Sequence, residues 1–543
     1  MTNGPIDPLV GPRYGLEGKV VTMDDTFRVL DRGVVYVNAS EIVHLEPSDV
    51  PPPPGFEESR VVHTGGTIFP GLIDLHNHLS YDVLPLWEVQ QRFSNRAKWS
   101  GLPEYRKLIS GPMQVLGRTS GMPEAVVRYV ECKCLIGGVT TSQGIALFSN
   151  QGIRRYYRGI VRNVEQTGEV ALPEASTRIS DVEAAESERF RRRLERSTCL
   201  LLHLSEGIDD AARSHFQALR MVSGQWAITS ALSGIHCAGL LPEDFAELGS
   251  NGGSMVWSPL SNLLLYGDTA RIAAAKSNGL TIGIGSDWSP TGSKNLLGEL
   301  KVARLVSESQ GGIFSDREIL ALATNNAARI LKWDGVIGSI VPGKRADLLV
   351  VTGRRGDPYQ RLLGAKETSI ALVVINGIPR YGQPRLLNQF TNESEPLRVG
   401  HSLRSLYLKQ DTADPVVGAL TLQAASERLS TAMRDLPALA RRLETPEIAA
   451  EFVGLESEEP RWYLVLDHNE LPGESFRPHL PIGPAGISTG LLATPEAAEP
   501  LSEVLAPIAL DQLTVVDDAD FLDRMGRQRN LPDFIKAGLQ DLY

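Results

Sequence analysis

The stretch Thr67-Ile-Phe-Pro-Gly-Leu-Ile-Asp-Leu-His-Asn-His-Leu-Ser80 decides the predicted fold of this chain. Its apolar, β-rich approach is typical of a strand buried on both faces, as the strands of parallel sheets are. At its end, His76 and His78 stand two residues apart. Residues i and i+2 of a strand point to the same face, so we expect both imidazoles to face one space and to share a metal ion. So short a pattern also recurs by chance among core and surface histidines. Whether His76 and His78 bind a metal therefore depends on the other polar residues of the chain.

Length and composition are those of a globular protein with more than one structural unit. The chain has 543 residues, more than one ordinary core requires, and a formal net charge of −11. This charge argues against nucleic acid and anionic membranes as partners. The first residues show no secretory signal, and no long apolar run predicts a membrane span. The four cysteines do not form a disulfide framework, so we expect a cytoplasmic protein.

Strand-like and helix-like segments alternate from about residue 68 to residue 330. Besides the strand that ends at His76, we expect strands at 138–142, 159–164, 169–172, 199–203, 231–236, 254–257 and 280–287. Helical segments such as 209–222 and 242–248 lie between them. This alternation predicts the α/β class and a (β/α)8 barrel of the TIM type. The aromatic stretch 86–99, which follows the first strand, is compatible with a substrate lid or with a packed surface helix.

The segments on both sides of the barrel are expected to be rich in β-structure. Residues 1–66 and 336–385 contain short strands separated by turns, and we expect them to pair into one β-sandwich beside a barrel of residues 67–335. Residues 386–543 form a C-terminal extension, in which 419–442 is predicted to be helical and 472–500 to be a Pro/Gly-rich loop. The extension carries no catalytic pattern. An interaction module, an oligomer contact and a cover for the barrel mouth are the alternatives for its role.

Polar side chains close several predicted strands, at the end where the chemistry of such barrels takes place. His203 ends one strand, and a neutral imidazole is a suitable ligand for Zn or Fe(II). Glu206 follows three residues later and is placed to shuttle a proton to a leaving nitrogen, although a helix N-terminus also favours glutamate. His236 ends another strand and can serve as a ligand, a base or an electrophile. Asp287 follows six largely apolar residues, where a carboxylate is costly to bury unless it is paired or bound to a metal.

At this point the chain resembles the amidohydrolase superfamily, in the branch of the cytosine, guanine and adenosylhomocysteine deaminases and the triazine chlorohydrolases. The resemblance spans about residues 15 to 382 and rests on the order of the motifs Pro70-Gly-Leu-Ile-Asp-Leu-His-Asn-His, His203-Leu-Ser-Glu, His236, Ser286-Asp287 and Pro342-Gly-Lys-Arg-Ala-Asp-Leu-Leu-Val-Val. It implies a single metal ion bound by His76, His78, His203 and Asp287. It also implies that Glu206 shuttles the proton, that His236 contacts the water or the substrate, and that the loop 258–262 helps to shape the pocket.

The lack of lysine in the middle of the predicted barrel indicates the number of metal ions. Binuclear members of the superfamily bridge two metals with a carboxylated lysine from the middle of the barrel. This chain has no lysine between Lys133 and Lys276. We therefore expect one divalent ion per chain, with Zn favoured and Fe as the alternative.

The predicted function is hydrolysis of a C–N bond by water that a metal activates. We expect Asp287, assisted by His236, to accept the proton of the water, and Glu206 to protonate the departing nitrogen. Deamination of an amino-substituted heterocycle is favoured over dechlorination, because Glu206 suits a leaving group that needs a proton. Hydrolysis of a linear or cyclic amide uses the same residues, and a catalytically inactive scaffold is the alternative from another class. The expected partner is a small-molecule substrate, and a homo-oligomer is compatible with the sequence.

Overall fold

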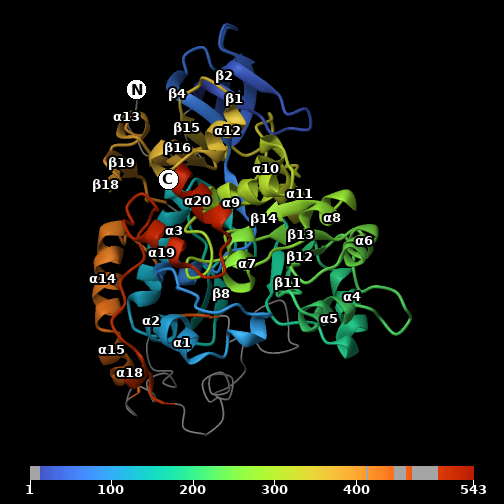
Figure 1. Ribbon diagram of the computed structural model, residues 1–543. Helices are drawn as coiled ribbons and strands as arrows, with labels where there is room; N and C mark the ends of the chain where they lie inside the picture. Colours follow the sequence, from blue (N-terminus) through green and yellow to red (C-terminus); the bar gives the residue numbers. More distant parts are fainter. Residues whose placement is uncertain (1–12, 411–413, 445–459, 467–498) are drawn as a thin grey trace.

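The computed structural model describes residues 13–410, 414–444, 460–466 and 499–543. A β-sheet unit lies at one end of the molecule, an α/β unit lies next to it, and helices from the C-terminal region run along one side (Figure 1). All four cysteines are buried and free. Within the described ranges, no helix combines the length and the apolar character needed to cross a membrane.

The β-sheet unit is built from segments on both sides of the α/β unit. Its nine strands have the spatial order β18 (Glu395–Val399), β19 (Ser402–Leu406), β17 (Ile378–Gly382), β16 (Ile370–Ile375), β15 (Leu348–Thr352), β4 (Arg60–Pro70), β1 (Tyr14–Val21), β2 (Val29–Asn38) and β3 (Glu41–Pro47). Strand β4 lies in the middle, parallel to β1 and antiparallel to β15, and so joins the two segments. The pairing forms one continuous sheet instead of the two sheets of a sandwich, and β18 and β19 extend it beyond residue 385.

This sheet curls so that its edge strand β3 contacts residues 344–345, just before the central strand β15. The Ile42 amide donates to the Lys344 carbonyl at 2.8 Å, and the Tyr14 hydroxyl donates to the Gly377 carbonyl at 2.8 Å. Apolar residues that alternate along the strands point into the resulting core, as the period of two requires. Leu16, Val35, Val350, Leu372 and Val374 are among these buried residues.

The α/β unit contains two groups of parallel strands. The three-stranded group has the order β5 (Leu72–Asp74), β6 (Val139–Ser142) and β9 (Arg162–Asn163). The five-stranded group has the order β10 (Ala175–Arg178), β11 (Cys199–Leu204), β12 (Leu232–His236), β13 (Ser254–Trp257) and β14 (Ile282–Ile284). Backbone hydrogen bonds join the groups at both ends, from Leu75 N to Ile284 O at 3.2 Å and from Ala175 N to Val164 O at 2.8 Å.

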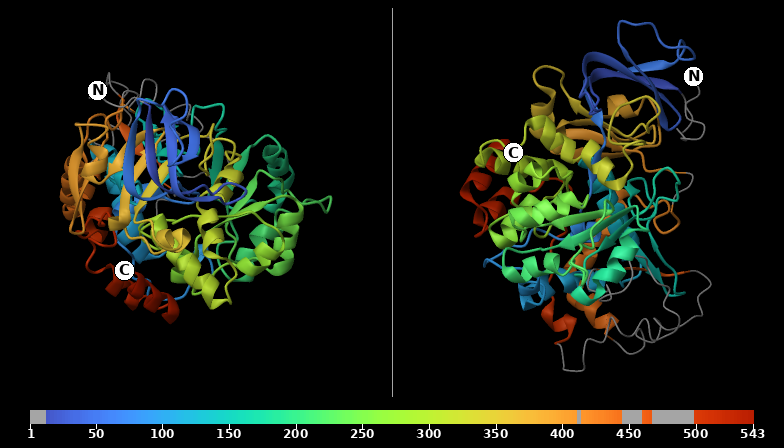
Figure 2. Two further views of the ribbon diagram at one scale, coloured as in Figure 1. Left: turned by 90° about the horizontal axis from the view of Figure 1, so that it is seen from above. Right: turned by 90° about the vertical axis from the view of Figure 1, so that its right-hand side faces the viewer.

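Helices follow most of these strands, which is the arrangement that alternating β and α segments predict. They are α3 (Met122–Ile136), α4 (Ser187–Leu194), α5 (Asp210–Gln217), α6 (Pro242–Ser250), α7 (Pro259–Tyr266), α8 (Ile272–Ser277), α9 (Leu296–Ser309), α10 (Asp316–Leu322) and α11 (Asn325–Leu331). Shorter helices are α1 (Pro103–Tyr105), α2 (Gly111–Leu116), α12 (Pro358–Leu363) and α13 (Pro384–Leu387). The helices cover the outer side of the strands (Figure 2).

The stretch that decides the fold contains two strands, not one. Strand β4 ends at Pro70 in the nine-stranded sheet, and β5 begins at Leu72 in the α/β unit. Gly71 permits this change of sheet, because a Cβ atom there would lie 2.3 Å from Thr140 Oγ1. The Pro-Gly pair therefore separates the two units at the point where the chain passes from one to the other.

His76 and His78 lie just after β5 rather than within it. Backbone hydrogen bonds to the end of β14 hold this segment, from Asp287 N to His76 O at 2.8 Å and from His78 N to Asp287 O at 2.6 Å. The two histidines therefore face one site, but pairing with a neighbouring segment places them, not an uninterrupted strand.

The prediction of a strand at residues 169–172 is wrong. These residues form a turn in which the Leu172 amide donates to the Glu169 carbonyl at 3.1 Å, and Val170 is fully exposed. The fourth strand is β10, which begins at Ala175 and pairs in parallel with β11. Local β preference is weak over so few residues, so the pairing with β11 determines which segment becomes the strand. A hairpin of β7 (Ala146–Ser149) and β8 (Arg154–Tyr156) is also absent from the predicted elements.

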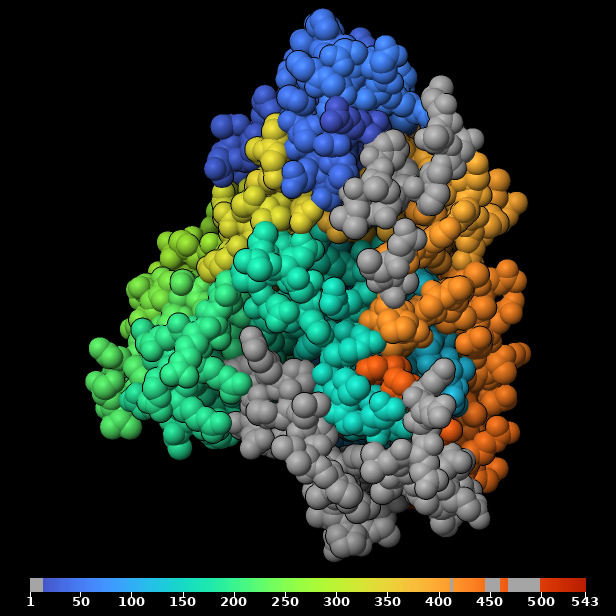
Figure 3. Space-filling view, turned by 180° about the vertical axis from the view of Figure 1, so that it is seen from behind, coloured from blue at the N-terminus to red at the C-terminus, as the bar shows by residue number. Residues whose placement is uncertain are grey.

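The C-terminal region is integrated with the rest of the molecule. Its elements are α14 (Leu422–Arg434), α15 (Leu436–Leu443), β20 (Trp462–Leu464), α18 (Leu501–Val504), α19 (Phe521–Arg527) and α20 (Asp533–Leu542). The helical prediction for residues 419–442 agrees with α14 and α15. Helix α14 packs against α3, and α20 packs against α9. Strand β20 joins the edge of the β7–β8 hairpin (Figure 3). The predicted loop at 472–500 lies outside the described residues except for its last two.

Candidate active site

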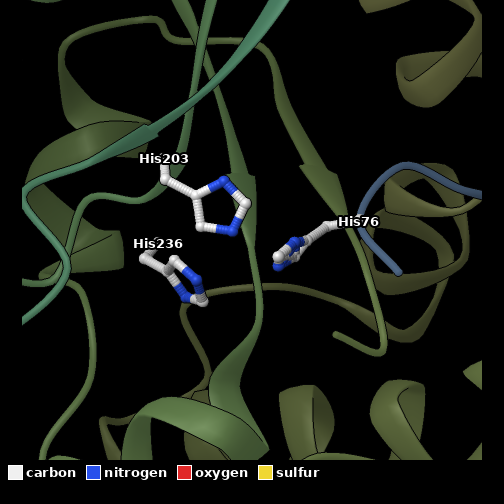
Figure 4. A group of neighbouring side chains, drawn as sticks. All are labelled: His76, His203 and His236. Atoms are coloured by element: carbon white, nitrogen blue, oxygen red, sulfur yellow. The ribbon is translucent and has the colours of Figure 1, made fainter. Parts of the chain in front are cut away.

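Four histidines and one aspartate meet at the ends of β5, β11, β12 and β14. His76, His203 and His236 point toward one another from three of these strand ends (Figure 4). Their ligand atoms lie within 4.8 Å of one another, and the same holds for the group of His76, His78 and Asp287. The structure thus brings together every residue that was predicted as a ligand, with His236 beside them.

Contacts within this cluster are short. His76 Nε2 lies 3.1 Å from Asp287 Oδ1, and His78 Nε2 lies 3.5 Å from the same oxygen. His78 Nε2 also lies 3.3 Å from His203 Nε2. Burial and the neighbouring imidazoles hold the pKa of His76 and of His203 well below the usual range. Both rings are therefore neutral at pH 7, which is the form that binds a metal.

The cluster fits a divalent ion. The Nε2 atoms of His76, His78 and His203 each lie 3.1 to 3.5 Å from another candidate ligand atom, and a cation between them would stabilise this close approach of lone pairs. Burial also raises the pKa of Asp287, and a nearby cation would favour its ionised form. Imidazole nitrogens together with one carboxylate are a donor set that suits Zn or Fe(II).

The backbone is strained where the strands enter the site. Ser205, His236 and Asp287 have φ values of 51°, 66° and 66°, in the left-handed region that residues other than glycine seldom adopt. Strain of this kind is typical of functional sites, because the surrounding fold has to maintain it. At Gly285, a Cβ atom would lie 2.4 Å from the Cβ atom of His76, so only glycine lets the end of β14 pass so close to this histidine.

Asp74, the last residue of β5, holds the histidine segment by hydrogen bonds. It accepts hydrogen bonds from the His76 amide at 3.3 Å, from the Ser286 amide at 3.1 Å and from the Ser286 hydroxyl at 2.5 Å. Burial raises the pKa of Asp74 to about 7. The sequence analysis missed this residue, although a carboxylate within an apolar run is the signal that singled out Asp287.

Glu206 lies beside the ligand cluster and is buried. The Tyr266 hydroxyl donates to Glu206 Oε1 at 2.8 Å, and Trp99 Nε1 donates to that hydroxyl at 2.9 Å. Arg96 Nη1 lies 3.6 Å from Glu206 Oε2, and His236 Nε2 lies 3.8 Å from the same oxygen. The carboxylate is therefore held between the histidines and a polar network, as a group that transfers protons has to be.

The alternative role of Glu206 as a helix-terminal carboxylate does not agree with the structure. Helix α5 begins at Asp210, and the side chain of Asp209 caps it by accepting a hydrogen bond from the Ala212 amide at 2.9 Å. Glu206 precedes this cap and faces the site instead.

Helix α7 supplies two residues that orient the catalytic candidates. Asn262 Oδ1 lies 2.9 Å from His236 Nδ1, so this nitrogen carries the proton and Nε2 is directed at the cluster. Tyr266, at the end of the same helix, holds Glu206. The loop 258–262 was expected to shape the pocket, and the structure places it in the first turn of α7. The roles of Asn262 and Tyr266 depend on contacts across the site, so no motif indicates them.

Aromatic rings surround the approach to His78. The ring centroids of His78 and Trp288 lie 5.7 Å apart, and those of Tyr81 and Trp288 lie 5.2 Å apart. Trp99 lies 6.1 Å from Trp288 and 5.3 Å from Tyr105. These side chains come from the segment after β5 and from the residue after Asp287. We call the rings of Tyr81, Trp99, Tyr105 and Trp288 the aromatic wall. A planar, unsaturated substrate ring can stack on such side chains.

Glu299 of α9 contacts the first turn of α7 and is buried. It accepts hydrogen bonds from the Leu260 amide, at 2.9 Å, and from the Ser293 hydroxyl. Burial raises the pKa of Glu299 to about 8, so this carboxyl group is largely protonated at pH 7.

We expect Glu299→Gln to change how stability depends on pH. The native pKa lies above the unfolded value, so the stabilising contribution of the protonated group is complete at low pH and is lost as the pH rises through about 8. Glutamine keeps the neutral, hydrogen-bonding form at every pH. Thermal unfolding between pH 5 and pH 9 should therefore favour the variant increasingly up to about pH 8, with little further change above it. A difference from the unmodified chain that is constant over this range would contradict the assignment.

Sequence comparisons show which known proteins this chain resembles. A family model described as the amidohydrolase family matches residues 214–379. A 5-methylthioadenosine/S-adenosylhomocysteine deaminase of Symbiobacterium thermophilum is 24% identical over 411 residues, which are 67% of this chain and 89% of that protein. The guanine deaminase of Escherichia coli strain K12 is 31% identical over 138 residues, which are 25% of this chain and 31% of that protein. The resemblance predicted from the sequence motifs is confirmed.

Solved structures share the fold. An atrazine chlorohydrolase from Arthrobacter aurescens TC1, complexed with zinc, gives a TM-score of 0.51 at 18% identity over 70% of this chain and 97% of that one. The guanine deaminase of E. coli gives a TM-score of 0.51 at 16% identity over 68% of this chain and 99% of that one. These neighbours indicate an α/β fold of the TIM-barrel type.

Proposed function

We propose that this chain, a relative of the amidohydrolases, is a metal-dependent hydrolase that deaminates an amino-substituted heterocycle. The observation that carries the proposal is the convergence of His76, His78, His203 and Asp287 on one point, with Glu206 beside them. The relatives named as deaminases support the reaction type. The aromatic wall around Trp288 supports a planar substrate.

The proposed site requires that the eight parallel strands close into one (β/α)8 barrel. In this arrangement the order is β5, β6, β9, β10, β11, β12, β13 and β14, and β14 returns to β5. The hydrogen bonds from Leu75 to Ile284 and from Ala175 to Val164 support this closure. All proposed ligands then lie at the carboxyl ends of the strands, where the active sites of such barrels occur.

One divalent ion is proposed for this site, with His76, His78, His203 and Asp287 as its ligands. When bound, such an ion lowers the pKa of a water molecule toward about 7 and stabilises developing negative charge. Zn is favoured because the ligands are imidazoles and one carboxylate, and a neighbour solved with zinc supports this choice. Lys133 stands at the start of the stretch that lacks lysine. Its ammonium group donates to Asp82 O, Ser289 Oγ and Asp511 Oδ2 and does not bridge the ligand cluster, which supports a mononuclear site.

The side chains of this site divide the proton transfers between them. Asp287 takes the proton of the attacking water, and the Nε2 atom of His236 stabilises the charge that develops, because Asn262 holds the opposite nitrogen. Glu206 delivers a proton to the departing nitrogen. Tyr266 keeps the Glu206 carboxylate at the position from which this transfer is possible. Closely packed aromatic rings orient the substrate and limit the entry of water.

The test is the metal content of protein purified without added metal, followed by a screen for ammonia release. We expect about one Zn or Fe per chain by elemental mass spectrometry and ammonia from a purine, pyrimidine, pterin or triazine that carries an amino group. Two ions per chain would contradict the mononuclear site. No metal, even after reconstitution, would contradict the hydrolase itself. Turnover of cyclic amides or chlorotriazines without any ammonia release would contradict deamination.

A further inference from the structure

The segment that ends in Trp99, one residue of the aromatic wall, lies against the active site. This segment, residues 86–99 and called the strap below, follows the 3-10 helix η1 (Leu79–Val83) and ends next to Glu206. The Arg96 amide donates to the Glu206 carbonyl at 3.2 Å, and the Ile208 amide donates to the Ser94 carbonyl at 2.7 Å. The position of the strap therefore affects both the wall and the proposed proton donor.

Most of the strap has no neighbouring strand to satisfy its main chain. Between residues 86 and 94 the described structure contains no ladder, although Leu86, Trp87, Val89 and Phe93 are buried. Two backbone bonds hold it at its ends, from Trp87 N to Pro290 O at 2.8 Å and from Phe93 N to Leu265 O at 3.0 Å. The groups between these points need other partners, because a buried, unpaired amide or carbonyl is costly.

Side chains from the C-terminal region supply these partners. Gln528 is buried, accepts a hydrogen bond from the Val89 amide at 3.1 Å and donates one to the Trp87 carbonyl at 2.9 Å. One side chain thus satisfies a donor and an acceptor two residues apart, as an adjacent strand would. Asn530 Nδ2 donates to the Gln91 carbonyl at 2.9 Å and to the Leu264 carbonyl at 2.8 Å, and so ties the strap to α7.

The C-terminal region is itself firmly anchored. The Asp511 amide donates to the Val83 carbonyl at 2.9 Å, at the end of η1. The buried Asp511 carboxylate pairs with Lys133 at 2.7 Å and also with Lys294. A buried carboxylate between two buried ammonium groups is costly to separate, because each charge would lose its counter-charge. This anchor fixes the C-terminal region against the loops that follow the first and the last barrel strands.

We propose that Gln528 and Asn530 are positioning residues of the active site, which fix the strap and thereby set the affinity for the substrate. The inference rests on the proposed function and extends it to a part of the chain in which no motif indicates a role. Gln528 acts through the main chain of Trp87 and Val89, not by contact with the metal ligands. Its loss should therefore weaken substrate binding and leave metal binding unchanged.

The test compares Gln528→Leu with Gln540→Leu in the full-length protein. Leucine removes both hydrogen bonds of Gln528 and fills its place with an apolar side chain of similar size. Gln540 is the matched control, because it is the same residue type, lies in the same C-terminal region in α20, is exposed and forms no hydrogen bond with the strap among the described residues. Hydrogen exchange of the peptides that cover residues 86–99, metal content and steady-state kinetics are measured on each protein.

For Gln528→Leu we expect exchange at residues 86–93 that is on the order of tenfold faster, with unchanged exchange in the barrel strands. KM should rise about tenfold while kcat changes less than about threefold and the metal content is unchanged. Gln540→Leu should match the unmodified chain in every measurement. If Gln528→Leu does not fold, Asn530→Ala removes the hydrogen bonds to the Gln91 and Leu264 carbonyls at a less buried position and should show a smaller change in the same direction.

Two results would overturn the inference. Unchanged exchange in the strap would show that Gln528 does not hold it, and faster exchange with an unchanged KM would show that the strap does not set substrate affinity. Failure of the proposed function would look different, since the unmodified chain would then release no ammonia. In that case the local exchange pattern alone decides whether Gln528 anchors the strap.

Discussion

His76→Ala should abolish both metal retention and turnover. His76 is the residue shared by the two groups of candidate ligands, it is fully buried, and its Nε2 atom lies 3.1 Å from Asp287. Alanine removes the ligand that both groups share, so neither group stays complete and the ion should no longer be retained. Elemental mass spectrometry of the purified variant should give no bound ion, where we expect about one per chain in the unmodified protein.

The control for this experiment is His401→Ala. His401 is exposed in the turn between β18 and β19, far along the chain from the site. Its replacement should change neither the metal content nor the rate. Normal occupancy in His76→Ala would disprove the assignment of His76 as a ligand, and with it the proposed metal centre.

Glu206→Gln should keep the metal and lose most of the activity. Glutamine has nearly the same shape and still accepts the hydrogen bond from Tyr266, but it cannot take up and release a proton. A loss on the order of 10²-fold or more in kcat is typical for the removal of a proton-transfer group. Metal analysis and ammonia release, measured on the same preparation, separate this effect from damage to the metal site.

Tyr266→Phe provides the comparison for Glu206. It removes the 2.8 Å hydrogen bond to Glu206 and leaves the carboxylate in place, so the loss of kcat should be smaller, about tenfold. Near-normal turnover in Glu206→Gln would show that this carboxylate transfers no proton. A larger loss in Tyr266→Phe than in Glu206→Gln would instead assign the main catalytic role to the tyrosine.

The ligand candidates could be recognised because each follows a short apolar run. A polar side chain directly after a buried strand is a local feature, and a carboxylate such as Asp287 in that position needs a partner. The same reasoning applied to Asp74 would have identified it as well. Residues 169–172 show the limit of local patterns, since the turn at Glu169 and the exposed Val170 have the composition of a strand but no partner.

Other residues of the site carry no local signal. Tyr266 contacts Glu206 from a different helix, and Gln528 contacts Trp87 and Val89 across more than 400 positions of the chain. A tyrosine at the end of a helix, or a glutamine after one, is an ordinary residue in the sequence. Their roles follow from the packing of distant segments, which no spacing of residues predicts.

The sequence by itself determined the α/β class, the family resemblance and the set of proposed ligands, because strand ends and apolar periodicity are properties of neighbouring residues. Tertiary structure alone decided that β4 and β5 belong to different sheets, that α7 orients His236 and Glu206, and that the C-terminal region holds the strap. These features depend on buried polar groups that find their partners only when the chain has folded, since each such group must be satisfied by whichever segment packs against it.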